Sequence, residues 1–391
     1  MVKGFWWDPN TPKERWFGVL EQKTETDIEL ICHTEKGSCA TLALSHGLTI
    51  HGRNANGRPV TLLVVRRDRI STSGGMTNIH LHPGYVLEGA HVDDRHSFRA
   101  RTLDLRLQHL YGWLGMTGFN QVGFMETAGK VSISYTRPEW RCHEVNSTMK
   151  VEFGLQTRHS SGSQKRSIEE DATISISCKS GFTFTRCWEM TMALRSLLHF
   201  AILKPIYAVG MTLRKCKGKK AKDKILDEIV VWSKNFREAK TERSIDGLWV
   251  FRYGDIATDF GAFFAKWLDY MVKYDEPLKC YTTTIYHRLP TTMEHLCLTQ
   301  ALDAYHGVRF ASHERRGFKQ KVEELCGLHQ KVLSELVPDI SAFAEQVRDT
   351  RDYLTHHNPE DLAKRNIVRG NADLIRLNEK LTIVFQSCVL T

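Results

Sequence analysis

The sequence lacks any long apolar run. No stretch approaches the roughly 18 residues that a membrane-spanning helix needs, and the opening segment MVKGFWWDPN has no apolar core of the kind that defines a secretion signal. We therefore expect no membrane partner and no export signal, and we predict a cytoplasmic protein.

Paired cysteines are missing as well. The chain has ten cysteines, and no two of them are spaced as C-x-x-C, so the sequence offers neither a zinc ribbon nor a thioredoxin-type motif. In a chain of this length, scattered cysteines are typical of reduced thiols in a cytosolic protein. We expect most of them to be small core residues.

Signatures of cofactor chemistry are also absent. The sequence contains no G-x-G-x-x-G, no P-loop and no G-x-S-x-G, so nucleotide and acyl-transfer chemistry lack support. His80-Leu81-His82 and the segment His91 to His96 have spacings that can chelate zinc. They flank turn-like segments without a matching cysteine or acidic cluster, and 18 histidines make chance pairs common. We predict neither a metal nor a cofactor.

What the sequence does have is length and positive charge. The 391 residues exceed one typical hydrophobic core, so we expect two or more domains. The formal net charge is +9, which favours polyanionic partners through long-range attraction.

Residues 1–185 alternate between apolar and polar residues with a period of two. The alternation is clearest in ELICHTE, RPVTLLVVRRD, GKVSISYT and ATISISCKS. Runs of this kind, rich in Val, Ile and Thr, are typical of half-buried strands. We predict a β-rich domain, in the form of two packed sheets. Trp6 and Trp7 are interpreted as the packing of an early strand, in preference to an exposed aromatic patch.

Residues 186–289 are predicted to form a helical and mixed connecting region with a basic loop, LRKCKGKKAKDK (213–224). The plainer interpretation of this run is a solvated surface loop. The functional interpretation is a phosphate-contacting patch, because lysine clusters neutralise nucleic-acid backbones. No aromatic residue interleaves the run, so base stacking is not expected there. The candidate RNA-binding residues are Arg214, Lys215, Lys217, Lys219 and Lys220.

Helical spacing dominates residues 290–391. Pro338 suits the start of one helix, and Asn358-Pro359 suits its end. A helical bundle is the natural arrangement for such a set, so the fold class is predicted as α+β, with the β-rich part first. The predicted helices cover residues 292–312, 317–335, 339–356 and 360–388.

The third of these helices carries a cation where an apolar residue is expected. Its spacing marks one buried stripe, formed by Ile340, Ala344, Val347 and Leu354. Position 351 continues the stripe, yet it is Arg351. A guanidinium on a core-facing seam is costly unless it is paired or functional.

A histidine ends the same helix. Arg348, Asp352 and His356 lie four residues apart and share a neighbouring face. Histidine titrates near neutral pH, and a helix C-terminus favours its protonated form. Arg351 and His356 are five residues apart, about 140° around an ideal helix, so one helix does not aim both at one atom. Two helices meeting across a dimer, or a loosened last turn, would solve this. The structural alternative is an Arg–Asp pair with a capping histidine.

The segment Thr350 to His356 reads TRDYLTH. It resembles the R-x(4–6)-H motif of HEPN domains, specifically the ApeA-like subgroup, whose pattern is roughly TRNYLTH. Asp352 stands where that family usually has asparagine. LTQALDAYHG (298–307) is similar to the first HEPN helix, in which Asp303 takes the place of an acidic residue.

The N-terminal part is similar to the same family. GFWWDPN (4–10), WFGVLEQ (16–22) and residues 85–113 resemble the ApeA N-terminal domain. In that family the last helices usually continue beyond the position at which this chain ends.

The resemblance implies a metal-independent endoribonuclease of abortive infection that cleaves host RNA, with transfer RNA as one target class. His356 suits the acid or base role, and Arg351 suits the phosphorane because its planar fork pairs two oxygens. Asp352 or Asp303 would orient them, and Arg348 lies beside them. Expected partners are RNA, a second copy of the chain through the HEPN domain, and a phage-derived trigger.

Two neighbouring residues and one alternative function complete the expectations. Tyr353 is interpreted as core packing in preference to base stacking, and His357 as an exposed linker histidine in preference to a spare base. The alternative function is a non-catalytic HEPN module that binds RNA or protein, with a ligand-sensing β domain.

Overall fold

The computed structural model divides the chain into two compact units, Met1–Ala265 and Lys266–Thr391. The chain carries a β-rich unit followed by a helical one, so the predicted α+β class is confirmed. The division of the chain at residues 185 and 289 stays a prediction. The residues that the structure describes are 1–24, 27–35, 48–73, 75–96, 98–125, 130–161, 166–215, 227–237, 249–311, 316–357 and 366–390.

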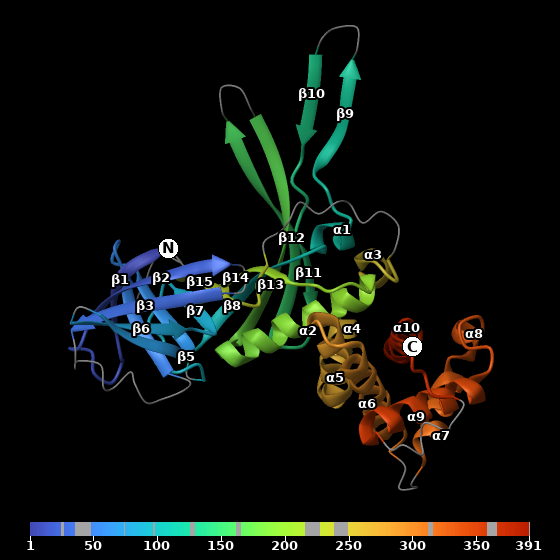
Figure 1. The fold of residues 1–391 in the computed structure, drawn as a ribbon. Coiled ribbons are helices and arrows are strands. Elements are labelled where there is room, and N and C mark those ends of the chain that lie inside the picture. Colours follow the sequence, from blue (N-terminus) through green and yellow to red (C-terminus); the bar gives the residue numbers. More distant parts are fainter. Residues whose placement is uncertain are drawn as a thin grey trace. The chain divides into compact units, whose positions relative to one another are not determined.

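The first part of the β-rich unit is a closed six-stranded antiparallel barrel (Figure 1). Its strands follow the order β4-β1-β2-β3-β6-β5, and the pairing of β5 with β4 closes the ring. The strands are β1 (Val2–Trp7), β2 (Trp16–Thr24), β3 (Asp27–Glu35), β4 (Leu48–Asn54), β5 (Pro59–Ser73) and β6 (Met76–His82).

Strand β5 joins the barrel to the rest of the sheet. Its first half pairs with β4 and with β7 (Tyr85–Glu88), whereas its second half pairs with β6. The change of partner falls at Val64, whose φ of 56° is unusual for a β-branched residue. Such a kink turns the strand, which lets one strand serve both the barrel and the open sheet.

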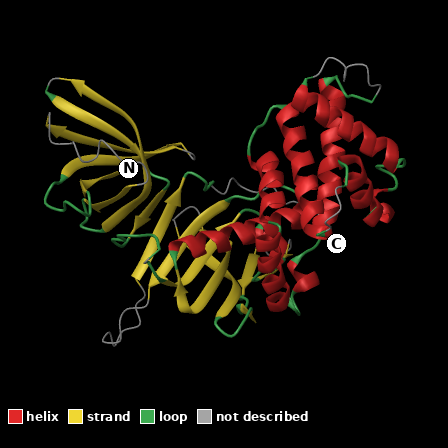
Figure 2. Cartoon of the chain, turned by 90° about the horizontal axis from the view of Figure 1, so that it is seen from below, coloured by secondary structure: helices red, strands yellow, loops and turns green. Residues whose placement is uncertain are grey.

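The remaining strands extend from β7 as an open antiparallel sheet. Figure 2 shows helix α2 (Phe184–Ile202) lying across these strands. The prediction of two packed sheets is therefore wrong in its detail: one sheet runs from the barrel to β11, because β5 is continuous. After β7 the order is β15 (Asp227–Ser233), β14 (Ala208–Lys215), β8 (Ala100–Leu107), β13 (Arg166–Phe182), β12 (Met149–Ser161) and β11 (Arg141–Glu144).

Smaller elements complete this unit. A separate hairpin is formed by β9 (Phe119–Met125) and β10 (Lys130–Tyr135). Its base is held by Glu170 of β13, whose carboxylate accepts hydrogen bonds from Tyr111, Thr117 and the Gly118 amide. The short helices are α1 (Leu110–Leu114) and α3 (Tyr253–Ile256).

The barrel interior is built around Trp6, which is fully buried. Its indole Nε1 donates a hydrogen bond to the Gly18 carbonyl at 3.2 Å. A Cβ at Gly52 would lie 2.3 Å from the indole, so only glycine leaves room for it there. Trp7 is also buried, at 6% exposure, which confirms the interpretation of both tryptophans as packing.

The helical unit is arranged around α6, which contacts α5, α7, α9 and α10. α4 spans the division between the two units. The predicted fourth helix was placed too early: residues 366–370 are not helical, and α10 starts at Asn371. The helices are α4 (Phe260–Lys273), α5 (Asp275–Tyr286), α6 (Thr291–Phe310), α7 (Phe318–Leu328), α8 (Gln330–Leu333), α9 (Ile340–His356) and α10 (Asn371–Leu390).

Two global features bear on the class of protein. None of the helices within the described ranges combines the length and apolarity needed to cross a membrane. The eight cysteines in those ranges are free thiols, and five of them are buried, as expected for small core residues: Cys32, Cys178, Cys187, Cys326 and Cys388.

Candidate active site in the helical unit

Helix α9 is fixed by its N-terminus and by one apolar face. The Asp339 side chain caps it by accepting a hydrogen bond from the Ala342 amide at 2.9 Å. Phe343, Ala344 and Val347 are buried. This anchoring sets the rotation of the helix and thereby the direction of every side chain in its last two turns.

Arg351 lies at the edge of that buried face, with 30% of its side chain exposed. Its Cζ atom is 4.6 Å from the centroid of the Phe318 ring of α7, a cation–π contact. Its Nη1 atom is 3.7 Å from Asp352 Oδ1. The guanidinium is thus held against a ring on one side while part of it faces solvent, where an anion can reach it.

His356 is the exposed last residue of α9. The helix stays regular up to this point, because the His357 amide donates to the Tyr353 carbonyl at 2.8 Å. The Thr355 hydroxyl also bonds to the Arg351 carbonyl at 2.8 Å. The last turn is therefore not loosened. At about 100° per residue, Arg351 and His356 of one chain leave the helix about 140° apart.

Helix α7 supplies contacts that the sequence reasoning missed. Lys321 Nζ donates to Asp303 Oδ1 of α6 at 2.6 Å. Phe318 and Lys321 are three residues apart, so they share one face of α7. On that face, Lys321 contacts Asp303 and Phe318 contacts Arg351. The only sequence signal was this spacing, which is common on amphipathic helices.

Arg348 is engaged in the fold. Its Nε and Nη2 atoms lie 2.8 and 2.7 Å from Asp349 Oδ1, and Nη2 lies 3.2 Å from Glu345. The hydrogen bond to Asp349 is the main reason that the pKa of Arg348 is raised. The guanidinium that is open to a ligand on α9 is therefore that of Arg351, whose carboxylate neighbour is more distant.

Tyr353 and His357 contact each other at the end of α9. Tyr353 is half-buried, and its ring stands at 86° to the imidazole of His357, with centroids 5.7 Å apart. His357 is exposed and forms the C-cap of the helix with a φ of 50°. Its backbone closes the helix, and its imidazole is one residue away from that of His356.

A buried histidine links two helices of the candidate site, α6 and α7. His306 of α6 is 3% exposed, and its Nε2 atom lies 2.6 Å from Glu324 Oε2 of α7. Arg316 contacts the same carboxylate oxygen. The hydrogen bond from His306, followed by that from Arg316, holds the pKa of Glu324 below its ordinary value. This cluster ties α6 to α7, which carries Phe318.

The predicted phosphate-contacting run lies in the other unit. Arg214 Nη2 lies 2.8 Å from Asp104, and its Nε lies 3.3 Å from Glu228. Lys215 Nζ lies 4.7 Å from the centroid of the Phe98 ring. Two carboxylates thus neutralise Arg214. Lys217, Lys219 and Lys220 lie outside the described residues.

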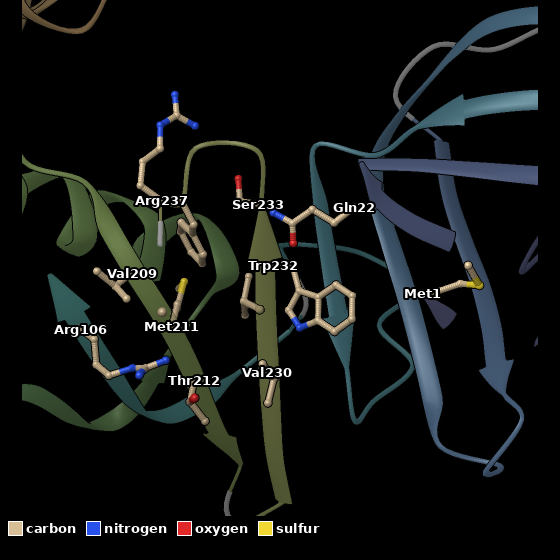
Figure 3. Close-up of a pocket in the computed structure, with 13 residues that line it drawn as sticks. Met1, Gln22, Arg106, Val209, Met211, Thr212, Val230, Trp232, Ser233 and Arg237 are labelled. Carbon is tan, nitrogen blue, oxygen red and sulfur yellow. The ribbon is translucent and has the colours of Figure 1, made fainter. Parts of the chain in front are cut away.

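The β-rich unit holds a cavity of about 390 Å³ between strands of the barrel and of the open sheet (Figure 3). Met1 and Gln22 line it from the barrel side, and Met211 and Trp232 line it from the sheet side. This volume is in the range of small-ligand sites. Of its two cations, Arg106 is paired with Asp171 at 3.1 Å, and Arg237 lies over the Tyr207 ring with its Cζ atom 4.9 Å from the centroid. Within the described ranges, no three His, Cys, Asp or Glu side chains are grouped to hold a metal ion.

Comparison with known families defines the class of protein first. A family model described as Apea-like HEPN matches residues 296–391, so the helical unit contains a HEPN domain. HEPN domains are generally ribonucleases, which suggests a protein of the ribonuclease-type defence class.

The β-rich unit then gives the family. A model described as ApeA N-terminal domain 1 matches residues 1–267, more than half of the chain, and the chain belongs to the ApeA family. Neither a curated protein nor a solved structure gives a significant match.

Proposed function

We propose that this protein is a metal-independent endoribonuclease that cuts host RNA in the cytoplasm during abortive infection. The observation that carries the proposal is the placement of Arg351. It is partly exposed at the end of α9 and held by Phe318, on the same helix end as the exposed His356.

The chemistry needs no group beyond these side chains and the RNA itself. The 2′-hydroxyl attacks the adjacent phosphorus while a base takes its proton, and the bond to the 5′-oxygen breaks as an acid protonates that oxygen. One imidazole can serve in both transfers, by taking the proton of the 2′-hydroxyl and then passing it, as imidazolium, to the 5′-oxygen. Arg351 stabilises the charge that grows on the non-bridging oxygens, because its fork matches two of them. The products are a 2′,3′-cyclic phosphate and a 5′-hydroxyl.

The proposal includes a homodimer formed through the HEPN domain. The regular last turn of α9 turns Arg351 and His356 of one chain about 140° apart. A second copy of the helix, related by twofold symmetry, would place the histidine of one chain beside the arginine of the other. The dimer therefore supplies the convergence that one chain does not offer.

The test is cleavage of a mixed RNA pool by the full-length protein in excess EDTA, with analysis of the fragment ends. We expect cyclic phosphate and 5′-hydroxyl ends from wild type and none from His356→Ala. Arg376→Ala is the matched control, because this α10 cation is 76% exposed and pairs with Asp373 of its own helix. Cleavage by His356→Ala at the wild-type rate would overturn the proposal.

A second candidate function is a non-catalytic HEPN module that binds RNA or protein. The observation that favours it is Asp352, whose carboxylate lies 3.7 Å from the Arg351 guanidinium and competes with a phosphate. Toxicity separates the two functions. An active nuclease stalls growth on expression, and Arg351→Ala relieves that arrest, whereas a binding module leaves growth unaffected in both forms.

The target and the trigger belong to the same proposal. Transfer RNA is the host RNA class that we propose first, and a phage-derived molecule is the proposed activator, sensed by the β-rich unit. Sequencing of RNA ends after induction, in cells with wild type or His356→Ala, identifies the target. Ends that are equally abundant in both strains would exclude this nuclease as their source.

A further inference from the structure

Two phenylalanine rings stand exposed side by side on the barrel. Phe5 of β1 and Phe17 of β2 are directly paired in the strand register, and they are 55% and 45% exposed. Their ring centroids are 5.8 Å apart, and the planes meet at 73°. Both strands are labelled in Figure 1. Single exposed apolar residues are common, but a paired aromatic surface is not needed to cover the barrel.

The outward position of both rings follows from the packing of Trp6. Successive side chains of a strand point to opposite faces. Because the Trp6 indole fills the interior beside Gly18 and Gly52, Phe5 must face outward. The pairing of Trp6 with Trp16, which is also buried, turns Phe17 outward in the same way. The strand register that buries Trp6 and Trp16 in the barrel core therefore also places Phe5 and Phe17 together on the outer surface.

Cations border the two rings. Arg53 of β4 is paired with Phe5 in the register, and Lys3 and Arg15 stand two residues before Phe5 and Phe17 on their own chain segments. All three are exposed. The three remaining flanking positions on β1, β2 and β3 carry no negative charge: they are Trp7, Val19 and His33.

We propose that the Phe5–Phe17 pair is a stacking platform for the bases of single-stranded RNA, with Arg53, Lys3 and Arg15 contacting its phosphates. Aromatic rings interleaved with cations are the chemistry by which proteins bind single strands. The 73° angle between the rings selects splayed bases, because the parallel bases of a duplex cannot lie flat on both rings. A protein interface would disfavour Lys3 at the edge of the rings, whereas a phosphate backbone pairs with all three cations.

This inference rests on the proposed ribonuclease function, since it names the form of RNA that the enzyme takes. It differs in location, because the platform lies in the N-terminal unit and the candidate catalytic residues lie in the other. Binding and cleavage can therefore be lost separately.

The test measures binding of a labelled single-stranded RNA of about 12 nucleotides, a length within the range of such sites. The full-length protein carries His356→Ala so that the RNA stays intact. Phe5→Leu and Phe17→Leu keep apolar area but remove the ring face. We expect each substitution to raise the Kd for the RNA by about 5- to 100-fold. Phe17→Tyr keeps the face and the affinity. Ile70→Ala is the matched control, because Ile70 is 46% exposed on β5 of the same barrel.

Two further readouts complete the test. Arg53→Gln is expected to lower the slope of log Kd against log salt concentration by about 0.7, as for the loss of one phosphate contact on a single strand. A duplex of the same sequence is expected to bind more weakly than the single strand. Thermal unfolding of each variant verifies that the barrel is intact.

Unchanged RNA affinity in folded Phe5→Leu and Phe17→Leu overturns the platform. The same result with loss of phage protection identifies the rings as a protein-docking surface and also overturns it. If wild type binds RNA through the rings yet never cleaves it, the nuclease proposal fails while the platform stands. If it cleaves and the rings are irrelevant to binding, the reverse holds.

Discussion

The guanidinium of Arg351 lies 4.6 Å above the centroid of the Phe318 ring. The two residues come from different helices, α9 and α7, so the contact fixes where the cation stands relative to the rest of the bundle. Removing the ring with Phe318→Ala is expected to lower the rate of RNA cleavage by about 3- to 30-fold, the range of a cation–π contact.

Phe318→Tyr is the control for this prediction, because tyrosine keeps a ring under the guanidinium. We expect the effect in kcat more than in KM, since a loosened arginine loses positioning before it loses charge. Single-turnover kinetics at saturating RNA measures it. Equal rates for Phe318→Ala and Phe318→Tyr would show that the ring does not position Arg351.

A composite site predicts complementation between two inactive variants. In a dimer of Arg351→Ala with His356→Ala, one of the two mixed sites contains both an intact arginine and an intact histidine. Random mixing makes half of the dimers mixed, so we expect about one quarter of wild-type activity. The measurement is cleavage by co-refolded chains. Absence of activity in mixed dimers that are shown to form would mean that the site lies within one chain.

Asp352 predicts an effect on substrate binding. Its carboxylate is 3.7 Å from Arg351 Nη1 and repels a phosphate that approaches this cation. Asp352→Asn is expected to lower KM for RNA by about 2- to 5-fold, the scale of a partly exposed ion pair. The asparagine keeps the size of the side chain. A raised KM would show instead that the carboxylate orients the guanidinium.

Glu324 predicts a pH dependence of stability. Its pKa is lowered in the folded protein, chiefly by the hydrogen bond from His306. The ionised carboxylate thus contributes stability above its ordinary pKa of 4.5, and that contribution is lost as pH falls through the lower folded value. We expect Glu324→Gln to lower the free energy of unfolding by about 1 kcal/mol at pH 7.

The matching experiment is denaturant unfolding of wild type and Glu324→Gln at pH 7 and at pH 3. The difference between the two proteins should shrink towards the acidic pH, because protonation of Glu324 removes its charge from wild type also. A difference that is constant with pH would trace the effect to side-chain packing.

Gly52 predicts a steric effect on the barrel. A Cβ there would lie 2.3 Å from the Trp6 indole, so Gly52→Ala forces the indole or the strand to move. We expect a loss of about 1–3 kcal/mol in the free energy of unfolding, the usual cost of overpacking. Gly254→Ala is the control, because a methyl group on that exposed helical glycine would meet no described atom within 4 Å. Equal stability of both variants would contradict the packing argument.

Local patterns predicted the elements better than their partners. The alternating runs around Ile31, Leu62 and Ile174 all form strands, because period-two burial is a property of the strand itself. Closure of the barrel depends on pairings such as β1 with β4, which join distant parts of the sequence. Strands β14 and β15 were missed because they follow a long helix and flank the basic run.

The candidate site shows the same division. Periodicity within α9 predicted that Arg351 would stand at a buried stripe, and it lies at the edge of one. Its contact with Phe318 was not predictable, because it depends on how α7 crosses α9. The pairing of Asp303 with Lys321 depends on the packing of α6 against α7 for the same reason. The roles of these residues stay a proposal.

Strand β5 has a consequence for dissection of the molecule. This single continuous strand pairs with strands of the barrel and with β7 of the open sheet. Deleting the barrel would remove β5, the partner of β7, and would leave β7 as an unpaired edge strand. Such edges promote aggregation. The barrel therefore cannot be removed from the first unit without exposing β7. We expect truncated proteins that begin after β6 to be insoluble.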